Sequence, residues 1–399
     1  RECDGLPIAV PVSSAKEGFD SVIDGFRLVR YKPIQKPGLN GSQRFKNGPA
    51  KLSEATFKKE GFAMKRWGMV SLILVLSVFF TVSAAPAQET LNAYSIWPEN
   101  WARPMFQEFE KATGIKVNFI RFSSGEALAR VIAEKNNPRV DVLFGGPVET
   151  HIAGIKEGVF EPYKPPAYAE LAPRFKDPNA YWVGIADDPL VFMSNNKFLK
   201  EKGLKPPASW DDLLHPAYKG MIQMADARTS GTAVTRIFSI LEVNGRNEDK
   251  AFEYMRKLRQ NVQVYTKSGG GGTIPVGLAQ AGAGIFFIVD ALKTRQEGYD
   301  VAISFPKEGI GTSVEAIALL KGAKNPAVGK KLIDWAASPA MQNFYAQYKI
   351  NFIPAHPAVK TEAGLAEIIK GAKIFPIEEA WAGQNRKRIV ERWIKDVLP

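Results

Sequence analysis

Apolar and polar residues follow two periods along most of the chain, one typical of strands and one typical of helices. Three short apolar runs predict strands: residues 91–96, 115–120 and 140–144. Between the first two runs, Phe106 and Phe109 share one face of a predicted helix, and Gly114 is placed to end it. Strands that alternate with helices in this way predict an α/β fold with parallel sheets covered on both faces.

The same alternation continues through the second half of the chain. Helices are predicted over residues 232–243 and 290–297, and a buried strand over residues 285–289. Asn325 and Ser338 each precede a proline, a pattern typical of a helix N-cap with proline at the first helical position. The sequence has no internal repeat and no low-complexity linker, which indicates that strands cross between the two halves.

Two long extended segments, residues 181–195 and 301–320, are suited to cross between two lobes. If both cross, each lobe is built from two stretches of sequence. The predicted boundaries are residues 88–188 and 306–338 for the first lobe, and residues 189–305 and 339–399 for the second. Ligands often bind where two lobes meet, so we expect the function to lie in the cleft between them.

One long apolar run, residues 69–82, predicts a targeting signal rather than a part of the fold. It follows Lys65 and Arg66, is too short to span a bilayer comfortably, and gives way to small residues before Gln88. We therefore interpret residues 64–87 as a secretory signal peptide, with a membrane anchor as the alternative.

Residues 1–63 precede that signal, and Gly and Pro interrupt them without a helical or strand period. The codons of Lys59, Glu60 and Gly61 can form a purine-rich ribosome-binding sequence ahead of Met64. We interpret residues 1–63 as an upstream region that is translated by mistake.

The composition is that of an ordinary globular protein, with 45% hydrophobic and 24% charged residues. The net charge of +12 would suggest nucleic acid, but residues 1–87 hold 13 of the 53 basic and 7 of the 41 acidic residues. The remaining 312 residues carry a net charge of +6 without cationic runs, and the single cysteine, Cys3, lies outside them. We therefore expect no nucleic-acid partner and a fold without disulfides.

Four segments share small hydroxyl and glycine residues placed after a predicted strand and before a predicted helix. They supply these candidate ligand-binding residues: Ser123, Ser124, Gly125, Gly145, Gly146, Thr229, Ser230, Gly231, Thr232, Ser268 and Gly269, and the last segment continues to Thr273. At a helix start the backbone N–H groups are unpaired and the dipole is positive, so an anion can be held without a buried cation. Each segment alone is more simply a helix cap, but four in one chain predict an anion-binding cleft.

Charged residues near these segments are the other candidates for ligand binding. Arg228 adjoins the third segment, and Asp188 lies in the first predicted crossing strand. Asp290 and Glu315 are further possible hydrogen-bond acceptors. A wider set comprises the charged residues Arg121, Lys267 and Glu149 and two possible stacking residues, Trp97 and Trp101. For each of these residues, a solvated or core position is the alternative.

Catalytic signatures are missing from the sequence. His151, His215 and His356 stand far apart, and none has a metal-ligand spacing. There is no Gly-x-Ser-x-Gly elbow and no phosphate-loop signature, and Cys3 is the only thiol. The predicted class is therefore non-enzymatic binding, with no catalytic residue, no metal and no cofactor.

Several stretches of the sequence resemble the extracellular solute-binding proteins of ABC importers. They are residues 106–117, 140–144, 209–213, 218–220 and 318–326, and the resemblance spans essentially all of residues 88–399. Within that superfamily the chain looks most like the branch that contains ferric-iron, phosphonate and sugar-phosphate binders. The resemblance implies a type II periplasmic-binding-protein fold, in which two α/β lobes joined by two hinge strands close on a solute and then dock on a membrane permease.

The resemblance also bears on the solute. Iron binders of this branch hold the metal with an adjacent Tyr pair, and the matching position here looks like Phe286 and Phe287 or the adjacent residues 288–290. No Tyr occurs in residues 283–292, and phenylalanine offers no oxygen to a hard cation such as Fe³⁺. By contrast, the hydroxyl and glycine segments match what phosphonate and sugar-phosphate relatives use to hold a phosphoryl group.

We therefore predict a periplasmic, monomeric solute-binding component of an ABC importer. It captures a small anionic solute, phosphorylated or phosphonate-bearing, and delivers it to the permease, while Asp188, Asp290 or Glu315 accepts hydrogen bonds from the solute's hydroxyl or amine groups. A ferric-iron carrier is the alternative within the family. An enzyme on this fold, such as porphobilinogen deaminase, would need a cysteine for its cofactor, and a regulator would need a helix-turn-helix region, which residues 1–87 do not supply.

Overall fold

The structure is a computed structural model that describes residues 88–398. Within this range a mixed sheet of twelve strands follows the order β2-β1-β3-β10-β5-β8-β6-β7, and the four other strands pair with β5 or β10. The predicted upstream region and signal peptide, residues 1–63 and 64–87, lie outside the described residues. No helix in the described part of the chain is long and apolar enough to cross a membrane.

The first part of the sheet is parallel, as the alternation of strands and helices predicts. Its elements are β1 (Thr90–Ser95), α2 (Glu99–Thr113), β2 (Lys116–Arg121), α3 (Ser124–Ala133), β3 (Val142–Pro147) and α4 (Val148–Lys156). Phe106 and Phe109 are buried on one face of α2. Gly114 ends this helix with φ 73°, in the left-handed region, as its place in the sequence predicts.

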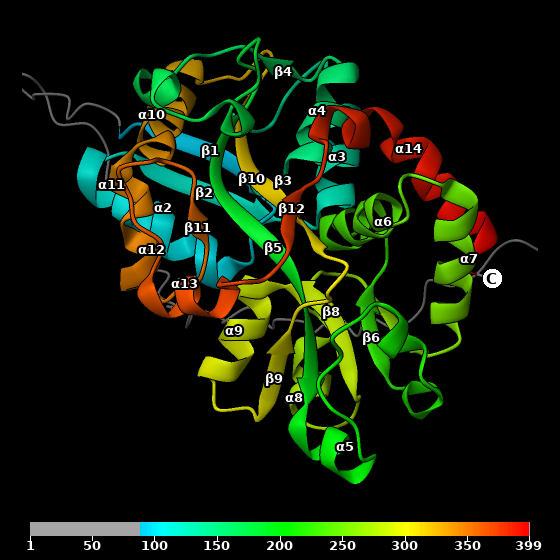
Figure 1. Ribbon diagram of the computed structural model, residues 1–399. Helices are drawn as coiled ribbons and strands as arrows, with labels where there is room; N and C mark the ends of the chain where they lie inside the picture. The colour runs from blue at the N-terminus through cyan, green and yellow to red at the C-terminus, as the bar shows by residue number, and fades with distance from the viewer. Residues whose placement is uncertain (1–87, 399) are drawn as a thin grey trace, which may run out of the picture. The chain divides into compact units, whose positions relative to one another are not determined.

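The strand β5 (Val183–Asn195) runs through the centre of the molecule, and all of its residues are buried. Its first half pairs antiparallel with β10 (Ile310–Leu320), and its second half pairs with β8 (Ala283–Phe287) and β9 (Val301–Ser304). β5 thus belongs to both groups of elements seen above and below the centre of Figure 1. The first predicted crossing segment is a single strand, whereas the second is divided into β9 and β10 by residues 305–309.

The second group of elements follows the same alternating pattern. It contains β6 (Ile222–Ala225), α6 (Gly231–Val243), α7 (Glu248–Arg259), β7 (Val262–Thr266), α8 (Thr273–Gly277), β8 and α9 (Ile288–Gln296). The helix predicted over residues 232–243 is confirmed to within one residue. The boundary between the strand predicted over residues 285–289 and the following helix is wrong by two residues, because Ile288 and Val289 are buried in the first turn of α9. A continuous apolar run does not mark where a buried strand becomes a buried helix.

The last part of the chain consists mainly of short elements. They are α10 (Pro326–Ala337), α11 (Pro339–Gln342), α12 (Phe344–Gln347), β11 (Ile353–Pro354), α13 (Ala363–Ile369), β12 (Ile374–Pro376) and α14 (Glu379–Asp396). Prolines open α10 and α11 as predicted. The Ser338 hydroxyl accepts a hydrogen bond from the Ala340 N–H at 3.2 Å, but the Asn325 side chain donates to the Thr90 carbonyl instead of capping α10.

Some elements of this last part contact the predicted first lobe. β11 pairs with the first half of β5, β12 pairs with the start of β10, and the Tyr345 hydroxyl donates to the Ile185 carbonyl at 2.9 Å. These three contacts are with elements of the predicted first lobe, whereas Leu365 of α13 packs with Val276 of α8 and Ala291 of α9, in the second lobe as the sequence analysis placed it. Strands of two or three residues carry no sequence signal for the sheet that they join. We propose that the first lobe includes β11 and β12.

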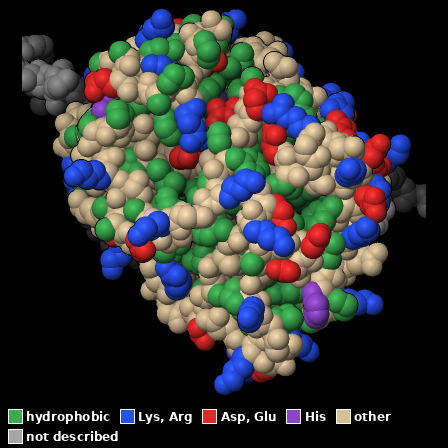
Figure 2. All heavy atoms as spheres, viewed as in Figure 1, with side chains coloured by type: hydrophobic (Ala, Val, Ile, Leu, Met, Phe, Trp, Pro, Cys, Tyr) green, Lys and Arg blue, Asp and Glu red, His purple; other side chains and the backbone are tan. Residues whose placement is uncertain are grey.

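The helix α14 contacts both groups of elements. Gly383 of α14 lies against Ile152 of α4, and Arg392 of α14 forms an ion pair with Glu248 of α7 at 2.8 Å. The remaining elements are β4 (Phe160–Glu161), α5 (Asn196–Glu201) and four short 3-10 helices, Pro166–Ala169, Pro173–Phe175, Asp211–Leu214 and Pro216–Tyr218. On the face drawn in Figure 2, basic and acidic side chains are interspersed.

Candidate solute-binding site

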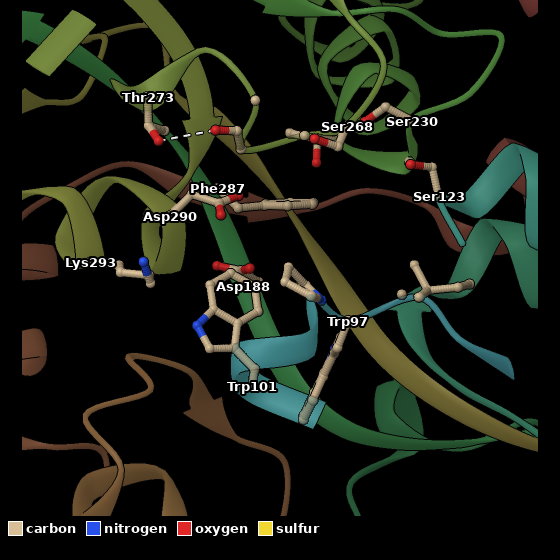
Figure 3. Close-up of a pocket in the computed structure, with 18 of the residues that line it drawn as sticks. Trp97, Trp101, Ser123, Asp188, Ser230, Ser268, Thr273, Phe287, Asp290 and Lys293 are labelled. Carbon is tan, nitrogen blue, oxygen red and sulfur yellow. Dashed lines mark hydrogen bonds between the residues drawn. The ribbon is translucent and has the colours of Figure 1, made fainter. Parts of the chain in front are cut away.

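A cavity of about 390 Å³ opens where the two groups of elements meet (Figure 3). The starts of four helices, α2, α3, α6 and α9, line it together with the loop before α8 and parts of β5 and β10. Eleven of the predicted ligand-binding residues line this one cavity: Ser123, Ser124, Gly146, Asp188, Ser230, Gly231, Thr232, Ser268, Gly269, Asp290 and Glu315. The structure thus brings together residues from all four predicted segments and three predicted acceptors.

Four predicted residues lie beside the cavity but do not line it. The Arg228 side chain turns to Asp226, with 2.5 Å between Nη2 and Oδ2, so its cation is already paired. The Thr229 carbonyl accepts a hydrogen bond from the Gly125 N–H at 2.8 Å, so both residues join neighbouring loops. Gly145 has φ 74° and lies against the Trp97 indole, where a side chain would collide. Arg228, Thr229, Gly125 and Gly145 therefore position the walls of the cavity.

The first end of the cavity consists of hydroxyl and backbone groups around the start of α6. We call it the hydroxyl end and define it by Ser230, Gly231, Thr232, Ser268 and Ser123. Ser230 precedes the helix without capping it, and the first turn of α6 contains no acidic residue. The backbone N–H groups of this turn are therefore not satisfied by a side-chain cap. Within residues 88–398 the Ser230 hydroxyl also has no hydrogen-bond partner, although the side chain is only 2% exposed. This end offers neutral donors and a positive helix dipole to an anion.

The start of α3 completes the hydroxyl end from the other group of elements. Gly231 packs so closely on Ser124 and Pro147 that a side chain at this position would collide with both. The Arg121 guanidinium donates to the Ser123 hydroxyl at 3.2 Å, and burial lowers the pKa of Arg121. Arg121 is thus the cation nearest to the hydroxyl groups, a role for which the sequence analysis also considered Lys267.

Two of the wider candidates do not reach the cavity. Lys267 forms an ion pair with Glu126 of α3 at 2.6 Å, and this pair links the loop after β7 to the start of α3. Glu149 is buried beneath the sheet, where Thr235 and Ser313 donate hydrogen bonds to it. Burial raises the pKa of Glu149 to about 7.

The second end of the cavity is acidic; we call it the carboxylate end and define it by Asp188, Asp290 and Glu315. Glu315 accepts hydrogen bonds from the Trp97 indole and the Gly146 N–H, both at 2.6 Å. Asp188 is 1% exposed and accepts only a long bond, 3.5 Å, from the Val289 N–H. Within residues 88–398 the Asp290 carboxylate has no hydrogen-bond or ion-pair partner.

Burial dominates the protonation of the carboxylate end. Removal from water raises the pKa of Asp290 to about 7 and that of Glu315 to about 8. The pKa of Asp188 lies well above its usual range, first because the group is buried and then because Glu315 and Asp290 are negative neighbours. A ligand that supplies hydrogen-bond donors or positive charge therefore stabilises these three carboxylates.

Aromatic side chains border the carboxylate end. Figure 3 shows Asp188 between Phe287 on one side and Trp97 and Trp101 on the other. The Trp97 ring stacks on Phe352 with 4.5 Å between the ring centres. Phe287 is a wall of the cavity, so the position considered in the sequence analysis for an iron ligand has an apolar ring.

Several lining residues were not identified as candidates from the sequence. Lys293 lies three residues after Asp290 on α9, so helical spacing could have placed both on one face. Thr273 ends the fourth predicted segment, and its hydroxyl donates to the Gly270 carbonyl at 3.0 Å (Figure 3). Phe352 lies in a stretch with no helical or strand period, so no sequence signal could have found it.

The described part of the chain contains no group of three or more His, Cys, Asp or Glu side chains arranged to hold a metal ion. Donors at one end of the cavity and acceptors at the other suit a small polar solute.

Two α/β lobes linked by crossing strands, with a polar cavity where they meet, define a type II periplasmic binding protein. The chain belongs to the family of bacterial extracellular solute-binding proteins, whose family model matches residues 104–375. This family consists of substrate-binding proteins and not of enzymes, and its members work with ABC permeases. The fold class and the general function predicted from the sequence are therefore confirmed.

Individual relatives show how far the similarity extends. An uncharacterised protein of Haemophilus influenzae is 29% identical over 343 residues, 82% of this chain and 96% of that protein. A putative 2-aminoethylphosphonate-binding periplasmic protein of Salmonella typhimurium is 27% identical over 284 residues, 68% of this chain and 81% of its own. The solved structure of the periplasmic binding protein AfuA from Actinobacillus pleuropneumoniae, with fructose-6-phosphate bound, gives a TM-score of 0.75 at 29% identity and covers 78% of this chain and 99% of that chain.

Proposed function

We propose that this protein captures a small solute with a phosphoryl or phosphonate group, which the hydroxyl end of the cavity holds. The observation that carries the proposal is the open start of α6, where the buried Ser230 hydroxyl and the uncapped first turn face the cavity. An anion there accepts hydrogen bonds from backbone and hydroxyl donors in the positive field of the helix. Ser123, with Arg121 behind it, adds donors from the opposite side.

Two relatives lend support to a phosphoryl group. The Salmonella protein is named for an aminophosphonate, and the AfuA structure contains a sugar phosphate. Both ligands carry a phosphorus oxyanion at one end and hydrogen-bond donors at the other. The hydroxyl end of this cavity offers donors to the oxyanion, and the carboxylate end offers acceptors to the donors at the other end of the ligand.

The cellular setting is part of the proposal. We propose that residues 64–87 direct the chain to the periplasm, and that the monomeric protein delivers its solute to an ABC permease by closing and opening its lobes about β5 and β10. The segments before residue 88 are upstream of the described structure. The charge of residues 88–399, spread without cationic runs, supports a small-molecule ligand rather than nucleic acid.

Ferric iron is the second candidate, since Asp188, Asp290 and Glu315 provide the anionic oxygens that a hard cation prefers. Phe287, which borders them, provides none. Glu315 is also already engaged by Trp97 and Gly146. These features favour the phosphoryl-bearing solute over the metal.

A thermal-shift and calorimetric panel tests the proposal. The compounds are inorganic phosphate, fructose 6-phosphate, 2-aminoethylphosphonate and ferric citrate, each added to the purified protein. A ligand that binds only the native state raises the melting temperature by mass action. We expect stabilisation by at least one organic phosphate or phosphonate and none by ferric citrate. Stabilisation by ferric citrate alone, with charge-transfer absorbance, would establish the iron alternative.

A further inference from the structure

The starts of α3 and α6 meet where the two predicted lobes face each other, beside the hydroxyl end of the cavity. α3 lies in the predicted first lobe and α6 in the second, and Ser123 and Ser230, which precede these helices, lie near each other in Figure 3. The lobes are in contact here through backbone atoms, because the Gly125 N–H donates to the Thr229 carbonyl at 2.8 Å. This contact uses protein atoms alone, so it can form with or without a solute.

Two glycines make this close approach possible. A Cβ atom at Gly125 would collide with the Arg228 carbonyl oxygen, a backbone atom of the other lobe. A Cβ atom at Gly231 would lie 2.6 Å from the Ser124 hydroxyl and 2.8 Å from the Pro147 ring, again in the other lobe. Each glycine therefore lies closer to the opposite lobe than a residue with a side chain could approach without a shift.

The local backbone does not require glycine at either position. Gly125 is the second residue of α3 and Gly231 is the first residue of α6, and neither has a positive φ. Alanine is more favourable than glycine in a helix, because glycine loses more conformational freedom on folding. Packing against the opposite lobe is thus the structural reason for glycine at both positions.

The charges at this contact are complementary as well. Helix starts carry a positive partial charge, so two of them repel each other unless an acceptor lies between them. The Thr229 carbonyl is such an acceptor for one N–H group of α3. Beside it, Lys267 of the second lobe forms an ion pair with Glu126 of α3 at 2.6 Å.

We propose that Gly125, Thr229 and Gly231 form an interlobe latch, the contact through which the lobes close over the cavity. Gly125 is then a positioning residue for solute binding, although it does not line the cavity. The inference rests on the part of the proposed function in which the lobes close and open about β5 and β10, and not on the identity of the solute. A side chain at Gly125 holds the lobes apart, so that the groups of the hydroxyl end no longer contact the solute together.

The distance between the lobes tests the latch without any solute. Spin labels are attached to cysteines introduced by Ala129→Cys in α3 and Val264→Cys in β7, two exposed positions, in the full chain with Cys3→Ser. Double electron–electron resonance then measures the distance between the labels. Gly125→Leu should move the distance distribution to longer values than in the labelled parent protein, with and without solute. Gly125→Ala is a milder second variant that improves helix propensity, so the fold is retained.

Solute affinity is the second measurement. Calorimetric titration with fructose 6-phosphate and with 2-aminoethylphosphonate should show binding weakened roughly tenfold or more by Gly125→Leu, and less by Gly125→Ala. Gly364→Leu is the matched control, because Gly364 is also the second residue of a helix, α13, and a Cβ atom there would meet only the Glu362 side chain. It should leave the distance and the affinity unchanged.

The outcomes separate the latch from the proposed solute. Distances in both Gly125 variants equal to those of the parent overturn the latch, and if binding is nevertheless weaker, Gly125 only shapes the wall of the cavity and the phosphoryl proposal stands. Longer distances with unchanged affinity overturn the positioning role of Gly125. If neither compound binds the parent protein, the proposed solute is wrong, whereas the distances still decide whether the latch exists.

Discussion

The two ends of the cavity meet a polar ligand by different means. The hydroxyl end is built from neutral groups at helix starts, where Ser230 and the first turn of α6 offer donors without a formal charge. The carboxylate end is built from Asp188, Asp290 and Glu315, which lie on β5, α9 and β10. Asp188 and Glu315 are buried and Asp290 is partly exposed, and their removal from water raises the pKa of each. The hydroxyl end can hold an anion with its own donors and helix dipole. The carboxylate end instead requires a ligand that brings hydrogen-bond donors or positive charge.

The difference also concerns the helix dipoles. The start of α9 already has carboxylates near it, since Asp290 lies in its first turn and Asp188 accepts from the Val289 N–H. The first turn of α6 contains no acidic residue, and the nearby Asp226 carboxylate is already paired with Arg228. An incoming anion is therefore expected at α6 and not at α9, which fixes the orientation of the solute.

The largest effect is expected at the hydroxyl end. Ser230→Leu removes a buried donor and fills the space beside Gly231, so binding of 2-aminoethylphosphonate or fructose 6-phosphate should weaken by about 3 kcal/mol, more than a hundredfold. Thr229→Val is the matched control, because the Thr229 hydroxyl bonds to the Lys267 carbonyl outside the cavity. Calorimetry measures both affinities, and circular dichroism checks the fold. A Ser230→Leu protein with unchanged affinity would place the anion elsewhere.

The carboxylate end should instead dominate the pH dependence of the solute-free protein. Because burial raises the pKa of Asp290 to about 7, the folded state holds its proton more tightly than the unfolded state does. Its contribution is thus most favourable at low pH and is lost as the pH rises from about 4 towards about 7. Compared with wild type, Asp290→Asn should be more stable by about 1–2 kcal/mol at pH 8 and equally stable near pH 4.

Urea unfolding of both proteins across this pH range measures the difference. The comparison with wild type removes the contribution of His151, whose pKa is lowered by burial to about 4 and which acts in the opposite direction. A difference that grows towards low pH would contradict the raised pKa of Asp290.

The smallest effect is expected at the rim, where the Lys267–Glu126 ion pair links the loop after β7 to the start of α3. Lys267 is 68% exposed, so the pair is screened by solvent and contributes about 0–1 kcal/mol. Lys267→Met should lower solute affinity by less than about fivefold, and the effect should shrink at high salt.

Lys257→Met is the control for the rim pair, since it breaks a similar exposed pair with Glu253 inside α7. It should leave solute affinity unchanged. A loss in Lys267→Met as large as that in Ser230→Leu would make the rim, and not the hydroxyl end, the main determinant of affinity.

The contrast between the two ends also explains how far the sequence could lead. The hydroxyl end consists of contiguous segments, and Ser-Gly or Thr-Ser-Gly before a helix is visible in a single sequence. Arg228 was placed in the site because it adjoins such a segment, but Asp226, two residues earlier, holds its side chain. Proximity in sequence therefore identifies a helix start better than it identifies the direction of a long side chain.

The carboxylate end depends on distant parts of the chain. Asp188 and Glu315 come together through the antiparallel register of β5 and β10, which the sequence does not specify. They could be predicted as acceptors but not as neighbours. Phe352 reaches Trp97 from an irregular segment, and similar long-range packing pairs β11 with β5 and β12 with β10. The α/β pattern and the family motifs fix the fold class without this information.

The position of phosphorus in a complex tests the central claim most directly. A crystal structure with bound 2-aminoethylphosphonate would locate that atom from its anomalous scattering. The two-ended cavity predicts phosphonate oxygens about 3 Å from the Gly231 N–H and the Ser230 hydroxyl, with the nitrogen directed at Asp188. A phosphonate group at the carboxylate end, or a ligand outside the cavity, would contradict it.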